Sequence, residues 1–161
     1  MRYKLKQKFW SFGDDYSILD ENDRTVFQVH GKPFSWGSNL SLMDANGQEV
    51  AHIKQKLFSL KPRFEIYKGG ELFAEVVKEF SWFKQKFLLD VPGPNDYTID
   101  GSFWEHEFAF HRMGREVARV SKKAWAASDT YGIDIVENED DVSILATCVV
   151  IDLVCHDGKD D

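Results

Sequence analysis

Apolar and polar residues alternate in short runs along most of this chain, which is the pattern of half-buried β-strands. The runs 40–42, 64–66 and 108–110 show it clearly. No stretch before residue 138 follows the 3.6-residue period of an amphipathic helix. The pattern therefore predicts a β-protein in which a helix can occur only near the carboxyl end.

A repeated motif, Lys-x-[Phe/Trp]-Ser, divides the chain into units. Its aromatic residues, and two later aromatics that continue the series, recur every 22 to 24 residues: Trp10, Phe34, Phe58, Phe80, Phe103 and Trp125. Each is followed a few residues later by the start of a strand-like run: Tyr16, Leu40, Phe64, Phe87, Phe108 and Tyr131. Such a regular period indicates one supersecondary unit used repeatedly.

A second motif, Gly-x-x-apolar-Ala-x-[Val/Ile], interlocks with the first and begins at Gly47, Gly70 and Gly114. Asn-Gly and Gly-Gly pairs at the first two sites suit tight hairpin turns. Each unit is therefore a predicted β-hairpin. Five hairpins, an opening strand at about 4–9 and a closing strand at 131–136 make twelve strands.

Twelve antiparallel strands leave two unpaired edges unless the sheet closes. A closed sheet of this size has a lumen too wide for strand side chains alone to fill. The apolar run Val142–Cys155, preceded by the acids Glu139, Asp140 and Asp141, suits a buried helix with an acidic amino end. The small residues Ala51, Ala74 and Ala118 would face inward and leave room for it.

The sequence thus predicts one domain, 1–161, mainly β: a closed twelve-stranded antiparallel barrel with strands within 4–136 and a central hydrophobic helix at about 140–156. The alternative is that the β-branched residues of 142–155 form another strand. Strands are usually shorter than this run, which favours the helix.

At this level the chain resembles the LURP-one-related family. The resemblance rests on the Gly-x-x-Val-Ala-x-Ile hairpin repeat, the Lys-Gln-Lys-[Phe/Leu] segments and the lone carboxy-terminal hydrophobic helix. That family is grouped with Tubby C-terminal domains, which bind phosphoinositide headgroups, and with phospholipid scramblases, which act at membranes. The resemblance covers the whole chain and implies a barrel with the helix threaded through it, but no headgroup-binding motif of the Tubby domains maps onto these residues.

The net charge of −7 is unevenly spread, because acidic residues crowd into 134–161 and leave the rest nearly neutral. A mildly acidic chain is not expected to bind nucleic acid. Cys148 and Cys155 would lie about 10 Å apart on a helix, too far for a disulfide, and two free thiols suit a reducing cytoplasm. No signal peptide is visible, and the longest apolar run is too short to span a bilayer.

No enzyme motif occurs in the sequence, so we expect no catalytic residue, no cofactor and no metal site. His106 and His111 could be imagined as metal ligands with Glu107, but on a strand they would point to opposite faces. Asp152, within the apolar run, has two interpretations. It either lies near the helix end and reaches solvent or a lysine, or it is a buried partner that fixes the register of the helix.

Basic residues give the strongest signal for a partner. They alternate along strands and follow the aromatic repeat; the candidate anion-binding residues are Lys6, Lys8, Lys54, Lys56, Arg63, Lys84, Lys86, Lys122 and Lys123. If they converge at one rim beside exposed aromatics (Trp10, Phe58, Trp82, Phe83 and Trp125), they would suit an anionic membrane surface or a phospholipid headgroup. The bland interpretation is that the lysines aid solubility and the aromatics are core.

Two functions follow from these interpretations. The first is a non-catalytic binding module for an anionic lipid or membrane surface, cytoplasmic and peripheral to the membrane. The alternative is a structural or protein–protein interaction domain without a small-molecule ligand. An enzyme ranks third.

Overall fold

The computed structural model describes residues 1–6, 16–32, 39–79, 85–123 and 130–156. Its strands are β1 (Arg2–Lys6), β2 (Tyr16–Leu19), β3 (Thr25–Lys32), β4 (Asn39–Asp44), β5 (Glu49–Gln55), β6 (Arg63–Lys68), β7 (Glu71–Glu79), β8 (Lys86–Asp90), β9 (Tyr97–Ser102), β10 (Glu107–Arg112), β11 (Arg115–Ser121) and β12 (Thr130–Ile135). One helix follows, α1 (Asp141–His156). These bounds match the predicted elements closely, although β1 already begins at Arg2.

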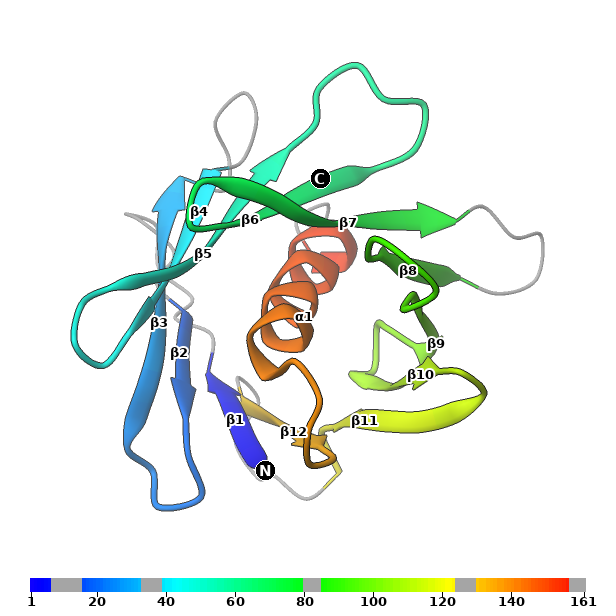
Figure 1. The fold of residues 1–161 in the computed structure, drawn as a ribbon. Coiled ribbons are helices and arrows are strands. Elements are labelled where there is room, and N and C mark those ends of the chain that lie inside the picture. The colour runs from blue at the N-terminus through cyan, green and yellow to red at the C-terminus, as the bar shows by residue number, and fades with distance from the viewer. Residues whose placement is uncertain (7–15, 33–38, 80–84, 124–129, 157–161) are drawn as a thin grey trace.

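All strands form one closed antiparallel barrel in which each strand pairs with its neighbours in sequence. Closure comes from β1 and β12, whose register places Tyr3 opposite Ile133 and Leu5 opposite Tyr131. Figure 1 looks along the barrel and shows α1 inside the ring of strands. The predicted fold class is confirmed, and 142–155 is a helix rather than a thirteenth strand.

The alternation of apolar and polar residues in the sequence corresponds to side chains that face the lumen and the outside of the barrel in turn. The residues predicted to start each strand-like run, Tyr16, Leu40, Phe64, Phe87, Phe108 and Tyr131, are all buried. Ala51, Ala74 and Ala118 are buried as well. The helix comes closest to β5, β6 and β7, so the small side chains of β5 and β7 give it space there.

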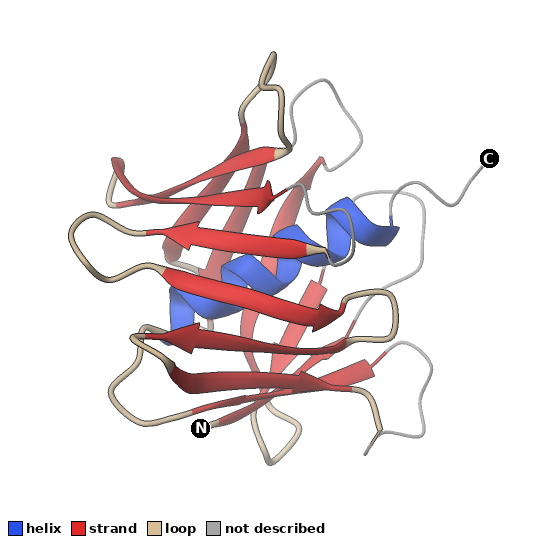
Figure 2. Ribbon diagram, turned by 90° about the vertical axis from the view of Figure 1, so that its right-hand side faces the viewer, coloured by secondary structure: helices blue, strands red, loops and turns tan. Residues whose placement is uncertain are grey.

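The barrel has two ends, which we name by the course of α1. The helix begins at the entry rim, where even-numbered strands end, and it ends at the exit rim, where odd-numbered strands end. Figure 2 shows α1 running from one rim to the other inside the barrel wall. Each residue at the end of a strand therefore lies at either the entry rim or the exit rim.

Candidate functional site

The predicted anion-binding residues that the structure describes all lie at the exit rim. Lys6 ends β1, Lys54 is the penultimate residue of β5 and Arg63 begins β6. The others occupy equivalent places: Lys56 just after β5, Lys86 at the start of β8, and Lys122 and Lys123 just after β11. Lys8 and Lys84 lie outside the described residues.

These cations form a ring rather than a pocket. Lys54, Lys56 and Arg63 come together on the β5–β6 hairpin, while Lys6 and the pair Lys122 and Lys123 flank the start of β12. Lys86, on β8, is separated from β6 by β7. An array of this kind matches an extended anionic surface better than a single small anion.

Most of the ring is available to a partner. The exposed lysines without an ion pair to any residue in the described ranges are Lys6, Lys54, Lys56, Lys86 and Lys123. Arg63 differs, because its Nη1 lies 2.6 Å from Glu75 Oε2. Lys61 Nζ similarly lies 2.7 Å from Glu79 Oε2. These two cations therefore stabilise the wall, and the lysines beside them remain free.

Apolar side chains are exposed at the same rim. Phe58 and Leu60 are 97% and 98% exposed, and Leu57 and Trp104 are about half exposed. The interpretation that these aromatics are core is wrong for Phe58. Phe103, which continues the aromatic repeat, is buried. Trp10, Trp82, Phe83 and Trp125 lie outside the described residues.

The entry rim has the opposite charge. The acidic residues in its turns and in the approach to α1 are Asp20, Glu21, Asp23, Asp44, Asp96, Glu137, Glu139, Asp140 and Asp141. Three of its cations are paired: Arg24 with Asp20, Lys68 with Asp140, and Arg112 with Glu139. Among the described residues, the two ends of the barrel therefore differ in charge.

Part of that acidity holds the helix in place. Glu139 accepts two bonds from the Arg112 guanidinium (2.7 and 3.1 Å) and one from the Tyr97 hydroxyl (2.8 Å). Asp140 caps the helix through Ser143 N (3.2 Å) and Oγ (2.7 Å), and it also accepts from Lys68 Nζ at 2.5 Å. We call this set, Lys68, Tyr97, Arg112, Glu139 and Asp140, the entry clamp.

The clamp shifts the pKa values of its members. Burial tends to raise the pKa of Glu139, but the bonds from Arg112 and Tyr97 outweigh it, and the pKa of that carboxyl is lowered. The pKa of Asp140 is lowered in the same way, by Lys68 and Ser143 against the effect of burial. Burial first, and then the bond to Glu139, raises the pKa of Tyr97 to about 12. Both carboxylates are thus held in their charged form.

A second polar cluster lies inside the barrel near the exit rim. Asp152 on α1 is only 2% exposed. The Tyr16 hydroxyl donates to its Oδ2 at 3.1 Å, and His106 Nε2 lies 3.0 Å from its Oδ1. Of the two interpretations of Asp152, the structure supports the buried one.

Tyr131 and Cys148 complete this buried cluster. The Tyr131 ring stacks on the His106 ring, with centroids 4.5 Å apart, and its hydroxyl has no hydrogen-bond partner. Burial, followed by the charge of Asp152, raises the pKa values of both Tyr131 and Cys148. A thiol with a raised pKa is a poor nucleophile. Both cysteines are free and buried, as expected.

Sequence reasoning missed this cluster because its members are far apart in the chain. A signal was nevertheless present, since a carboxylate in an apolar helix requires buried donors. Tyr16, at the start of β2, supplies one of these donors.

The imagined metal ligands do not converge. His106 faces Asp152 in the lumen, whereas His111 Nδ1 lies 3.5 Å from Asp100 Oδ1. Within the described ranges, no group of three or more His, Cys, Asp and Glu side chains could hold a metal ion.

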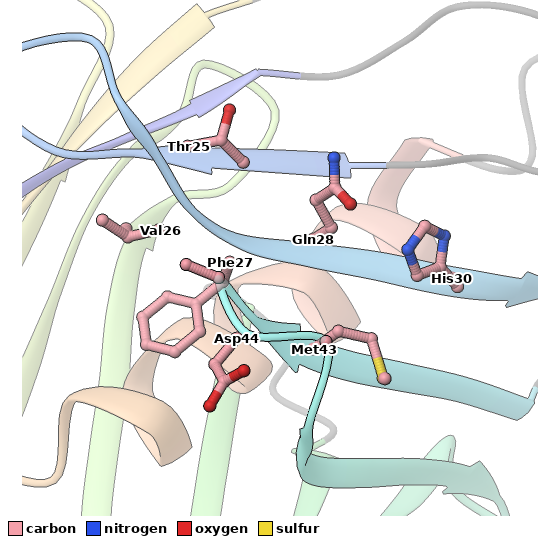
Figure 3. A pocket seen from close by; sticks show the side chains of 9 residues that line it. Thr25, Val26, Phe27, Gln28, His30, Met43 and Asp44 are labelled. Carbon is pink, nitrogen blue, oxygen red and sulfur yellow. The ribbon is translucent and has the colours of Figure 1, made fainter.

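Shallow depressions mark the surface of the described part, and three of them avoid the predicted residues. One, of about 310 Å³, lies over β3 and β4 and is lined by residues that include Gln28, His30 and Met43 (Figure 3). Two others, of about 270 and 470 Å³, lie beside Met1 near the entry rim. Because these three depressions lie away from the predicted cations, we place the candidate site on the exit rim.

A closed antiparallel barrel with a hydrophobic helix through its centre defines the structural class of this protein. Within that class the chain belongs to the LURP-one-related family, whose model matches residues 1–152.

One protein and one solved structure are similar to this chain. The chain is 36% identical over 157 residues to the uncharacterized protein YxjI of Bacillus subtilis (strain 168), covering 98% of this chain and 95% of that protein. Its fold is similar to the X-ray structure of a protein from Arabidopsis thaliana, with a TM-score of 0.64 and 18% identity over 93% of this chain and 88% of that one. The second likeness concerns the fold alone. No described helix has the length and apolar character needed to cross a membrane.

Proposed function

We propose that this protein is a non-catalytic binding module that places its exit rim against an anionic membrane surface and contacts phospholipid headgroups there. The observation that carries the proposal is the shared position of the unpaired lysines Lys6, Lys54, Lys56, Lys86 and Lys123 with exposed apolar side chains. Cations beside exposed aromatics suit the headgroup region, where charge and apolar surface are both accommodated.

The polarity of the barrel supports this orientation. An anionic surface would attract the exit rim and repel the acidic entry rim, so a protein with a net charge of −7 could still approach in one orientation. The resemblance to Tubby C-terminal domains and scramblases agrees with a lipid ligand.

The test is sedimentation with vesicles at low and high salt. The protein should bind vesicles that contain phosphatidylglycerol, bind much less to pure phosphatidylcholine, and be released as salt rises. The double variant Lys54→Glu/Lys56→Glu should weaken binding by at least about tenfold, since each cation near an anionic membrane contributes about 1 kcal/mol.

A matched control is Arg115→Glu, which reverses an exposed charge at the entry rim. It should leave vesicle binding unchanged or slightly weaker. If the protein fails to sediment with anionic vesicles at low salt, the proposal is contradicted. Protein partners that persist in pull-downs after charge reversal of Lys54, Lys56, Lys84 and Lys86 would favour the alternative, an interaction domain.

A further inference from the structure

We infer that the loop between β5 and β6, residues 56–62, inserts Phe58 and Leu60 into the apolar layer of the bilayer. The inference rests on the proposed function, and it adds that contact with the membrane is a penetration at one defined point rather than a purely electrostatic attachment.

Exposure is the first observation. Phe58 and Leu60 stand 97% and 98% exposed, more than any other large apolar side chain in the described ranges. In Figure 1 this loop, drawn in teal between β5 and β6, projects away from the barrel wall. Two large apolar groups on one projecting loop are unfavourable in water unless a partner covers them.

The loop is nevertheless held firmly at its base. Lys56 N donates to Arg63 O at 2.9 Å, and Lys78 N donates to Pro62 O at 3.0 Å. The ion pairs of Lys61 with Glu79 and of Arg63 with Glu75 tie the same base to β7. The base of the loop is therefore fixed relative to β7.

Phe58 itself has a φ of +61°, in the left-handed region that is unfavourable for a bulky residue. Its side chain is nevertheless almost fully exposed and is therefore available to a partner.

Charge decides which partner covers the tip. Lys54 and Lys56 are exposed beside it and make no ion pair with any described residue. A bilayer with anionic headgroups offers opposite charge to these lysines and an apolar layer to Phe58 and Leu60 at the depth of one side chain. A two-fold contact with a second copy would instead bring the same lysines against each other.

The experiment uses a fluorescent probe that responds to its surroundings. Cys148 and Cys155 are buried, so the variant Phe58→Cys can be labelled selectively at its introduced thiol. With phosphatidylglycerol-containing vesicles, the probe should shift to shorter wavelength and should be quenched by lipids that carry the quencher on their acyl chains. The control Asn46→Cys places the probe on an exposed entry-rim turn and should show neither change.

A second variant measures the contribution of the apolar tip to binding. Phe58→Ser/Leu60→Ser keeps every lysine, so low-salt binding should weaken by at least about tenfold while remaining salt-sensitive. As salt rises, release of the wild-type protein should be partial, because salt does not screen the apolar contact, whereas release of the variant should be complete. Both residues are exposed, so the thermal midpoint should stay at the wild-type value.

The outcomes separate the two proposals. Vesicle binding without acyl-chain quenching overturns the insertion but leaves the anionic-surface proposal standing. An absence of vesicle binding overturns both. A wavelength shift that appears without vesicles and grows with protein concentration shows that a second copy covers the tip, and it also overturns the insertion.

Discussion

The two ends of the central helix are fixed by different chemistry. At the entry rim, the clamp consists of charged partners that are partly open to water, such as Arg112 and Lys68. Near the exit rim, Asp152 is buried, and a tyrosine and a histidine lie at hydrogen-bond distance from its carboxylate. Water screens the first set and cannot reach the second.

This difference in burial predicts which substitutions should affect stability most. A partly exposed ion pair contributes modestly, because each charge can turn to solvent when its partner is lost. The donors around a buried carboxylate cannot turn to solvent. When the carboxylate is removed, leaving these donors unsatisfied lowers the free energy of unfolding. The single buried acid should therefore outweigh the more numerous clamp residues.

Removing the whole helix should have the largest effect. Deletion of residues 138–161 would empty the lumen and expose the inner faces of all strands to water. We expect an insoluble or molten product, checked by near-ultraviolet circular dichroism and thermal melting. Cooperative melting of the truncated protein at the wild-type temperature would contradict the view that α1 completes the core.

Asp152→Ala should come next, with a loss of about 3 kcal/mol in the free energy of unfolding. The substitution leaves the Tyr16 hydroxyl and His106 Nε2 without their acceptor in the core. Urea denaturation measures the loss. Asp152→Asn is the matched control, because it keeps the size and one acceptor oxygen and should cost less. A loss below about 1 kcal/mol for the alanine variant would show that the pair is unimportant.

Arg112→Ala should lower the free energy of unfolding by about 1–2 kcal/mol, since it removes a forked interaction with the largely buried Glu139. Arg119→Ala is the control, because its ion pair with Glu116 is about half exposed on both sides. That control should change stability by no more than about 0.5 kcal/mol. If the two variants lost equal amounts of free energy of unfolding, the clamp would contribute no more than an ordinary surface ion pair.

The destabilisation caused by Arg112→Ala should shrink in acid. The pKa values of Glu139 and Asp140 are lowered in the folded protein from ordinary values of 4.5 and 3.8. Their contribution is therefore complete above those values and is lost as pH falls through the lowered ones. Denaturation of wild type and variant at pH 7 and at pH 3 measures this, and a difference that grows in acid would contradict it.

Tyr131→Phe should have the smallest effect, and one of opposite sign. Its hydroxyl is buried without a partner, so removing it should leave stability unchanged or raise it by up to about 1 kcal/mol. Tyr16→Phe removes a hydroxyl that donates to Asp152 and should lower stability by about 1 kcal/mol. A loss for Tyr131→Phe as large as that for Tyr16→Phe would mean that the hydroxyl has a partner after all.

The fold was readable from the sequence because its information is local. Alternation and turn chemistry around Gly47, Gly70 and Gly114 define hairpins, and consecutive hairpins allow few arrangements other than a barrel. The helix was predicted from residue 140 and begins at Asp141. The same repeat did not predict burial, since Phe58 is exposed and Phe103 is buried at equivalent positions.

The site was only partly readable. The common rim of the lysines follows from strand parity, and the structure places the described ones there. The cluster around Asp152 depends on which lumen residues face one particular turn of α1. No spacing along the chain encodes that meeting, because His106 and Tyr16 lie 46 and 136 residues from Asp152.

The pairing of β1 with β12 sets an order on synthesis. β1 pairs with residues 130–134, so it is synthesised well before this neighbour exists, and α1 is synthesised later still. Until β12 and α1 are in place, the sheet has two unpaired edge strands and an exposed apolar inner face. A contact between strands so far apart in the chain is expected to slow folding.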